Sequence, residues 1–145
     1  MYKDTIWFDI QARGKFASTR RYAAEFSECP PYILEKLSRD EHDGVRRAVA
    51  MNPNCPGEAL EILSRDEDNV VRWRVANNPK CPIYILEILS RDNDYWVRWS
   101  VAENPNCPLH ILEILALDEK YEVRSEVVRN PNCSEEIKVA FALEN

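Results

Sequence analysis

Five cysteines are the residues of this 145-residue chain that most clearly invite chemistry, and they recur at a fixed interval. They stand at positions 29, 55, 81, 107 and 133, which are 26 residues apart. Equivalent positions on stacked helices lie ~8–10 Å apart. A disulfide needs Cα atoms within about 7 Å, and zinc needs its sulfur ligands ~2.3 Å from one point. The spacing therefore predicts small buried thiols, with no metal, no disulfide and no cofactor.

Other residue types follow the same period. Proline follows the first four cysteines, and Asn-Pro precedes the last four. Each copy also carries two leucines, an aspartate and a Val-Arg-x-x-Val segment, as in residues 55–80, CPGEALEILSRDEDNVVRWRVANNPK. Self-similarity at this period is typical of stacked supersecondary units, in which each repeat packs only on its neighbours.

Each copy predicts two helices joined by short turns. The first is expected to begin at the Cys-Pro pair, because proline suits the first helical position. The second is expected to begin with Asp66 as its N-cap and to bury Val71 and Val75. It should end near Asn78, because the residue before Pro79 is disfavoured in helical conformation. The chain is therefore predicted to be an all-α solenoid.

One repeat domain, residues 1–145, is expected, with atypical ends. Residues 1–28 lack the cysteine and predict an N-terminal cap repeat, because a terminal repeat has one side in water. Four full repeats follow at 29–54, 55–80, 81–106 and 107–132, and residues 133–145 predict a C-terminal capping helix. The total is about five two-helix repeats.

The repeated phrase Leu-x-x-Leu…Asp-x-x-x-x-Val-Arg-x-x-Val-Ala-x-Asn-Pro-x-x-Pro resembles the leucine-rich repeat variant family, with a HEAT-like Asp and Val-Arg core. It covers about residues 29–140. The resemblance implies a right-handed superhelix of paired helices and a scaffold that binds other macromolecules. That family is also known for an iron–sulfur cluster in a separate cysteine-rich segment, which this sequence lacks, so the cluster is not carried over. One copy of the phrase comprises Leu60, Leu63, Asp66, Val71, Arg72, Val75, Ala76, Asn78, Pro79 and Pro82.

One arginine and one aspartate recur in every full copy. Such arginines could form an anion-binding stripe, but binding residues usually differ between repeats. We therefore expect each arginine to join the aspartate six residues before it, or the adjacent repeat, through charge-assisted hydrogen bonds. Arg72→Ala should then destabilise the fold. This structural ladder comprises Asp40, Arg46, Asp66, Arg72, Asp92, Arg98, Asp118 and Arg124.

Charge and composition argue against several functions. A formal charge of -6 and a pI near 5.0 give no broad attraction to nucleic-acid phosphates. His42 and His110 lack partners at a catalytic spacing, so we expect no enzyme; a HEAT-like DNA glycosylase would need a basic groove. No apolar run approaches the ~18 residues of a membrane span, and no secretory signal opens the sequence. We expect a cytoplasmic protein without a membrane partner.

The copies differ most on the face of the second helix that points away from Val71 and Val75, where binding residues of repeat proteins vary. Tryptophan, tyrosine and arginine dominate binding hot spots, and Trp73 and Trp99 occupy the same repeat position. We expect these two and Trp96 to form an exposed aromatic patch on a concave face. The residues expected to bind a partner protein are Arg47, Met51, Trp73, Arg74, Asn77, Tyr95, Trp96, Trp99, Glu103 and Tyr121.

The leading hypothesis is a non-enzymatic protein-binding module: an adaptor, inhibitor or assembly factor. Trp73→Ala and Trp99→Ala should then weaken partner binding by at least ~2 kcal/mol each and leave thermal stability almost unchanged. The alternative is a binder of single-stranded nucleic acid, whose tryptophans stack on bases while Arg47, Arg74 and Arg129 hold phosphates. Two further interpretations are that the rings pack between repeats, and that Leu117 marks a self-assembly patch on a monomer or weak dimer.

Overall fold

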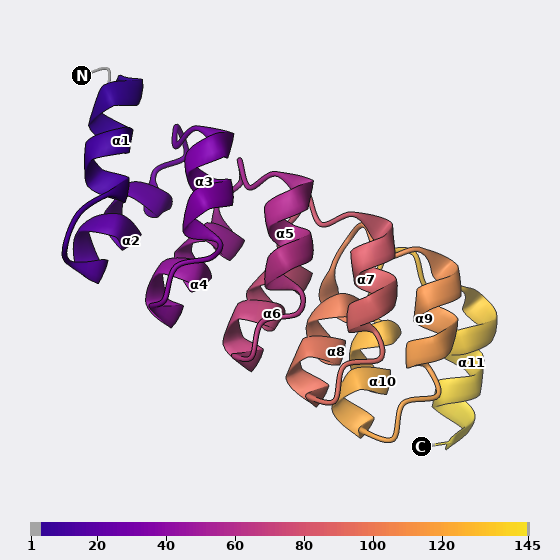
Figure 1. Ribbon diagram of the computed structural model, residues 1–145. Coiled ribbons are helices and arrows are strands. Elements are labelled where there is room, and N and C mark those ends of the chain that lie inside the picture. The colour runs from indigo at the N-terminus through magenta and orange to yellow at the C-terminus, as the bar shows by residue number, and fades with distance from the viewer. Residues whose placement is uncertain (1–3, 145) are drawn as a thin grey trace.

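The computed structural model describes residues 4–144, and these contain eleven helices and no strand. The helices alternate between two rows that run along the molecule (Figure 1). The first helices of the repeats are α1 (Thr5–Ala12), α3 (Pro31–Leu37), α5 (Gly57–Leu63), α7 (Ile83–Leu89), α9 (Leu109–Leu115) and α11 (Glu135–Glu144). The second helices are α2 (Ala17–Glu25), α4 (Asp43–Met51), α6 (Asn69–Ala76), α8 (Tyr95–Glu103) and α10 (Tyr121–Val127). The predicted all-α solenoid is confirmed.

The predicted cap segments 1–28 and 133–145 include residues 1–3 and 145, which lie outside the described residues. Within the described part, α1 and α2 pack on α3 and on α4, the first and second helices of the next unit. Helix α11 buries none of its residues completely. Across residues 4–144, every helix is too short or too polar to traverse a bilayer.

Buried leucines and valines form continuous rows through the stack. In one repeat they are Leu60 and Leu63 of α5 with Val71 and Val75 of α6, and all four are fully buried. Their counterparts in the neighbouring repeats are equally buried. The predicted burial of Val71 and Val75 is confirmed, and it leaves the rest of each second helix available for polar contacts.

Each first helix that follows a Cys-Pro pair begins one residue later than predicted. Pro56 has extended backbone geometry and is the N-cap of α5, so the helix begins at Gly57. The adjoining Cys55 thiol is buried, as are the other four, and all five cysteines are free. Burial raises the pKa of the Cys29, Cys55, Cys81 and Cys107 thiols to about 12. The thiols are therefore neutral near pH 7 and pack as small apolar groups.

The predicted cap of the second helix is wrong by two residues. Asp68, not Asp66, is the N-cap of α6, and its carboxylate accepts a hydrogen bond from Val70 N at 3.1 Å. Asp94 caps α8 in the same way, through Trp96 N at 2.8 Å. Asp66 instead accepts a hydrogen bond at 2.9 Å from the backbone N–H of Asp68, the residue immediately before α6. Its carboxylate is thereby turned toward the preceding repeat.

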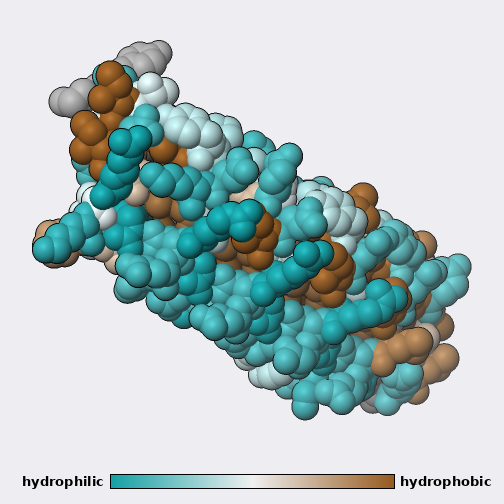
Figure 2. Space-filling model, viewed as in Figure 1, coloured by the Kyte–Doolittle hydropathy of each residue, from teal (hydrophilic) through white to brown (hydrophobic). Residues whose placement is uncertain are grey.

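The two rows of helices differ in how closely they pack. Each second helix contacts the next along much of its length, whereas neighbouring first helices touch at few residues. We use the term inner face for the surface of the second helices that carries the residues pointing away from the buried valines. The view in Figure 2 is mostly hydrophilic, with hydrophobic patches near the N-terminal end, in the middle and toward the C-terminal end.

Candidate functional site

The arginines of the predicted ladder connect neighbouring repeats. Arg46 Nε and Nη2 donate to the two carboxylate oxygens of Asp66 at 2.6 and 3.1 Å, and Nη1 donates to the backbone oxygen of Asp40 at 2.9 Å. The carboxylate thus lies 20 residues further on, and the aspartate six residues earlier supplies only its carbonyl. The same geometry joins three other pairs, Arg20–Asp40, Arg72–Asp92 and Arg98–Asp118.

These ion pairs are largely withdrawn from water. Burial alone would raise the pKa of Asp118, but the hydrogen bonds from Arg98 and from the backbone N–H of Lys120 lower it below its usual range. The hydrogen bond to Asp118 in turn raises the pKa of Arg98. Both groups are charged at neutral pH, and each satisfies the other. The ladder arginines consequently have little capacity left for an external anion.

The ladder is incomplete at its C-terminal end. Arg124 Nη1 donates to the backbone oxygens of Asp118 and Glu119 at 2.8 and 3.3 Å. Its Nε is buried and has no hydrogen-bond partner among the described residues. The position 26 residues after Asp118 is Glu144, whose carboxylate lies 4.0 Å from that Nε. Arg124 therefore lacks the close carboxylate that the other ladder arginines have.

A second row, of buried asparagines, was missed by the sequence analysis. Asn78 Nδ2 donates to the backbone oxygens of Ala50 and Asn52 in the previous repeat, at 2.8 and 3.1 Å. Its Oδ1 accepts the backbone N–H of Lys80 at 2.9 Å, which closes the turn. The equivalent asparagines are 52, 104 and 130, and all are buried. Their recurrence before each proline was the available signal, but it was interpreted only as a turn.

The inner face carries the residues predicted to bind a partner. Nine of the ten lie within α4, α6, α8 and α10, and Asn77 is the C-cap of α6. The structure therefore places them along one row of helices, as the repeat period indicated. Their contacts divide the row into three parts: a groove near α4, an aromatic cluster on α6 and α8, and an acidic end on α8 and α10.

The aromatic cluster is less exposed than predicted. Trp96 is 51% exposed, but Trp73 and Trp99 are half-buried and pack against the core. The rings of Trp96 and Trp99 meet edge to face, with centroids 5.9 Å apart, and Tyr95 lies 5.0 Å from Trp96. The expectation of an exposed patch therefore holds for Trp96, whereas Trp73 and Trp99 are only partly exposed. A second helix has a neighbour on each side, so a side chain that points away from the core is still partly covered.

Tyr121 does not join this cluster. Its ring lies 5.7 Å from that of Phe141 in α11, and the guanidinium of Arg124 lies 6.0 Å from its centroid. Tyr95 is contacted from the other side by Lys120, at 5.9 Å from the ring centroid. The two tyrosines thus link successive repeats near the starts of α8 and α10.

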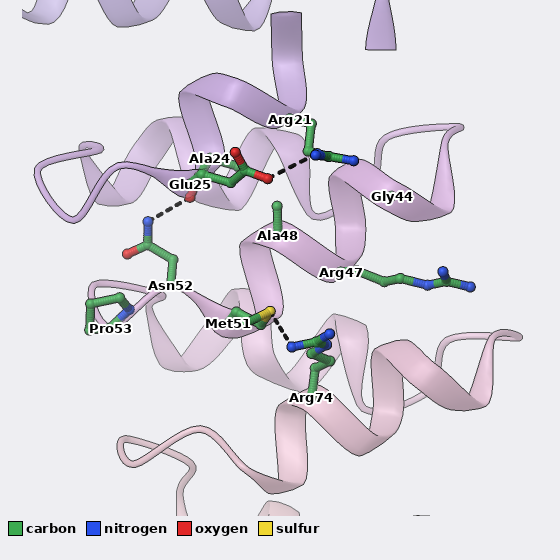
Figure 3. Close-up of a pocket in the computed structure, with 10 residues that line it drawn as sticks. All are labelled: Arg21, Ala24, Glu25, Gly44, Arg47, Ala48, Met51, Asn52, Pro53 and Arg74. Carbon is green, nitrogen blue, oxygen red and sulfur yellow. Dashed lines mark hydrogen bonds and ion pairs between the residues drawn. The ribbon is translucent and has the colours of Figure 1, made fainter. Parts of the chain in front are cut away.

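A groove of about 480 Å³ lies between α2, α4 and α6 (Figure 3). Arg21 pairs with Glu25 at 2.9 Å, and Arg47 pairs with Asp43 and Asp68 at 2.9 and 2.7 Å. The small residues of α4 in the lining are Gly44 and Ala48. Gly44 stands where the other full repeats carry larger side chains, and this difference is the sequence signal for the groove.

Arg74 differs from the other arginines of the groove. Its guanidinium stacks on the ring of Trp73 at 4.8 Å, and Nη1 contacts the sulfur of Met51. Its Nε is buried without a hydrogen-bond partner in the described part of the chain. No carboxylate of residues 4–144 forms an ion pair with it. Arg74 therefore holds a positive charge at the groove that these residues do not neutralise.

The opposite end of the inner face is acidic. The Asn77 amide, oriented to satisfy its neighbours, donates to Glu103 Oε2 at 3.1 Å and accepts from Trp73 Nε1 at 2.9 Å. Burial and the nearby charge of Glu126 raise the pKa of Glu103. The Glu126 side chain is only 12% exposed and lies 3.4 Å from Arg129. The inner face thus changes from cationic at α6 to anionic at α8 and α10.

The remaining candidates lie elsewhere. Leu117 is 85% exposed and borders a cavity of about 260 Å³ near α11, so it is accessible for the predicted self-assembly, which stays a prediction. His42 caps α4 through Gly44 N at 3.1 Å, and His110 Nε2 lies 2.8 Å from Glu87. Among the described residues, His, Cys, Asp and Glu side chains form no group of three suited to a metal ion.

Residues 43–68 match the family model described as Leucine rich repeat variant. No curated protein and no solved structure matches the chain. The matched segment runs from the start of α4, through α5, to the N-cap of α6, and so spans one 26-residue period. It contains Arg46 and Asp66, the ion pair that joins two repeats. The predicted resemblance to the leucine-rich repeat variant family is thus confirmed at residues 43–68, where the sequence matches one repeat of that family.

Proposed function

We propose that this protein is a non-enzymatic module that binds another protein on its inner face. The observation that carries the proposal is Arg74, which lies unneutralised by residues 4–144 between a groove and a tryptophan ring. Arginine and tryptophan are the residue types that contribute most to protein interfaces. A helical repeat scaffold also suits this role, because its recognition residues vary between repeats on the inner helices.

The charges of the inner face support a protein partner over single-stranded nucleic acid. Of the three arginines that could hold phosphates, Arg47 and Arg129 are already paired with carboxylates of the chain. Their charges would add little to the counterion release that drives binding to phosphate backbones. Glu103 and Glu126, on the helices that follow, would repel such a backbone.

The two histidines have evident structural partners. His42 accepts a hydrogen bond at the start of α4, and His110 forms a pair with Glu87 on the neighbouring first helix. The first contact begins a helix, and the second joins two helices. These roles, together with the scaffold character of the repeat family, support binding in place of catalysis.

Photocrosslinking from the two faces tests this proposal. A benzophenone amino acid replaces Trp96 on the inner face or, as the control, Tyr84 on α7, which is 47% exposed on the first-helix row. In an extract of the source organism, the probe at 96 should give discrete protein adducts that unlabelled wild-type protein competes away. Equal adducts from both positions would contradict inner-face binding. Adducts that disappear on nuclease treatment would favour the nucleic-acid alternative.

A further inference from the structure

We propose that the inner face recognises a bipolar peptide segment, with a carboxylate that pairs with Arg74 and a cationic side chain that meets Glu103 and Glu126. An apolar side chain of the segment would lie on the tryptophans between them. This inference rests on the proposed function and specifies the chemistry of the partner. Charge complementarity with the two ends of one surface is the basis of the argument.

The cationic end has an unmet requirement. Arg74 Nε is buried without a hydrogen bond among the described residues, and the guanidinium contacts the Met51 sulfur and the Trp73 ring. A buried donor without a partner destabilises the free protein, because burial removes its hydrogen bonds to water. A carboxylate is the strongest partner for a guanidinium, because the pair can form two parallel charge-assisted hydrogen bonds. The buried Nε is closed to a partner, but a partner carboxylate would pair with the Nη atoms of the same guanidinium and neutralise its charge.

The acidic end has the opposite requirement. Glu103 and Glu126 repel each other, and together with burial this raises the pKa of Glu103. Arg129 reaches Glu126 at 3.4 Å from an exposed position, so it compensates for only part of the negative charge. A lysine or arginine of the partner would relieve the repulsion. A wholly acidic segment would be rejected here, and a wholly basic one would be rejected at Arg74.

The repeat geometry sets the separation of the two charges. Arg74, Ser100 and Glu126 are 26 residues apart and lie on α6, α8 and α10. Two helix spacings of ~8–10 Å place the ends ~16–20 Å apart. This distance corresponds to about five or six residues of an extended segment at ~3.3 Å each, or about 11–13 residues of a helix at ~1.5 Å each. Ser100, midway, is fully buried, so the middle of the surface carries no charge at this position.

Labelled synthetic peptides test the inference by fluorescence anisotropy with the purified full chain. Each peptide has an alanine–leucine middle, and its two ends are Glu and Lys, Glu and Glu, or Lys and Lys. The set is made with charges separated by six or by twelve residues, which distinguishes an extended from a helical segment. Wild-type protein should bind a bipolar peptide at least ~10-fold more tightly than either uniform peptide, which is ~1.4 kcal/mol.

Charge reversals then identify the two ends. Arg74→Glu should shift the preference to the Lys–Lys peptide, and Glu126→Lys should shift it to the Glu–Glu peptide. Arg74→Gln removes the positive charge without adding a negative one. It should weaken binding of the bipolar peptide and leave binding of the Lys–Lys peptide unchanged. The matched controls are Arg39→Glu and Glu35→Lys, at exposed positions on the first-helix row, which should change nothing.

Two results would overturn the inference. One is equal affinity of wild-type protein for all peptide classes, or binding of none. The other is an Arg74→Gln variant, with an unchanged circular dichroism spectrum, that keeps the wild-type preference. Either result leaves the protein adducts from position 96 unaffected, because that measurement does not depend on partner charge. Failure of the bipolar segment is therefore distinguishable from failure of the proposed function.

Discussion

The rows that join the repeats and the inner face lie on the same second helices, yet they differ in how strictly they repeat. The asparagine row places the same amide on the same two carbonyls, 26 and 28 residues earlier, in repeat after repeat. At another position of the same helices, the residues are Arg47, Trp73, Trp99 and Ser125. Contacts that hold one repeat to the next require the same residue each time. Where the contact is not the same in every copy, as at Arg47, which pairs with Asp68, the residues differ, and the surface they form can specialise.

The largest expected loss of stability comes from removing one asparagine of the row that joins the repeats. Asn78→Ala removes the Asn78 partner of the Ala50 backbone oxygen and of the Lys80 backbone N–H, whereas the Asn52 oxygen keeps its hydrogen bond from the Cys55 N–H. We expect a loss of roughly 2–4 kcal/mol in the free energy of unfolding, because each unpaired buried polar group costs about 1–3 kcal/mol. Urea unfolding followed by circular dichroism measures it. The control is Asn106→Ala, which removes an exposed hydrogen bond to Pro79 O and should cost much less. Equal losses would contradict the role of burial.

The ladder allows the stability loss to be compared for two arginines: Arg72, which has a close carboxylate, and Arg124, which lacks one. Arg72→Ala removes two hydrogen bonds to Asp92, at 2.7 and 3.0 Å, and leaves that carboxylate unpaired. We expect a loss of about 1.5–3 kcal/mol, the range for hydrogen bonds to charged groups. Arg124→Ala should cost clearly less, because its nearest carboxylate, that of Glu144, is 4.0 Å away. If the two substitutions lower the urea midpoint equally, the inter-repeat ion pair is not the stabilising contact.

Substitution of the three tryptophans tests how much residues of the inner face contribute to the stability of the fold. Trp73→Ala and Trp99→Ala should lower the free energy of unfolding by about 1–2 kcal/mol, because both indoles are half-buried on the core. Trp96→Ala, at 51% exposure, should lower it by less than about 0.5 kcal/mol. The expectation that Trp73 and Trp99 could be removed without loss of stability is thus revised. Thermal and urea unfolding of the three variants will show whether the order holds.

The smallest expected effect is the pH dependence of the ladder. The folded-state pKa of Asp118 is lowered, so its contribution is present above the unfolded value of about 3.9 and is lost as pH falls through the folded value. Wild-type protein should therefore lose more stability between pH 7 and pH 3 than Asp118→Asn does. Urea unfolding at the two pH values measures the difference. An identical pH dependence in the two proteins would show that the carboxylate does not respond to Arg98.

Much of the fold follows from the period, because local signals agree with it in every copy. The buried valines and the two helices per repeat were predictable from spacing alone. The cap was not: Asp66 recurs like a cap, but its carboxylate faces Arg46 of the preceding repeat, and sequence spacing does not show in which direction a side chain reaches. The partners of Asn78 are backbone carbonyls, which no residue pattern identifies.

The positions of the candidate site residues could be predicted from the sequence, but their degree of burial could not. Helical spacing places Trp73 and Trp99 away from the valines, and in the structure both are partly exposed and partly packed on the core. How far a neighbouring helix covers them depends on the distance between the helices, which the sequence does not contain. The groove beside Arg74 likewise depends on the small Gly44 and Ala48 of another repeat. Its charge pattern emerges only when the ion pairs of Arg47 and Arg129 are known.

The asparagine row has a consequence for the length of the molecule. Each amide reaches back by one repeat and no further, to carbonyls 26 and 28 residues earlier. Duplicating or deleting one internal unit of 26 residues would therefore recreate the same bonds across the new junction. The solenoid can grow or shrink by one unit without redesign of its interior. A change of this kind would move the cationic and acidic ends of the inner face apart, or together, in steps of one helix spacing.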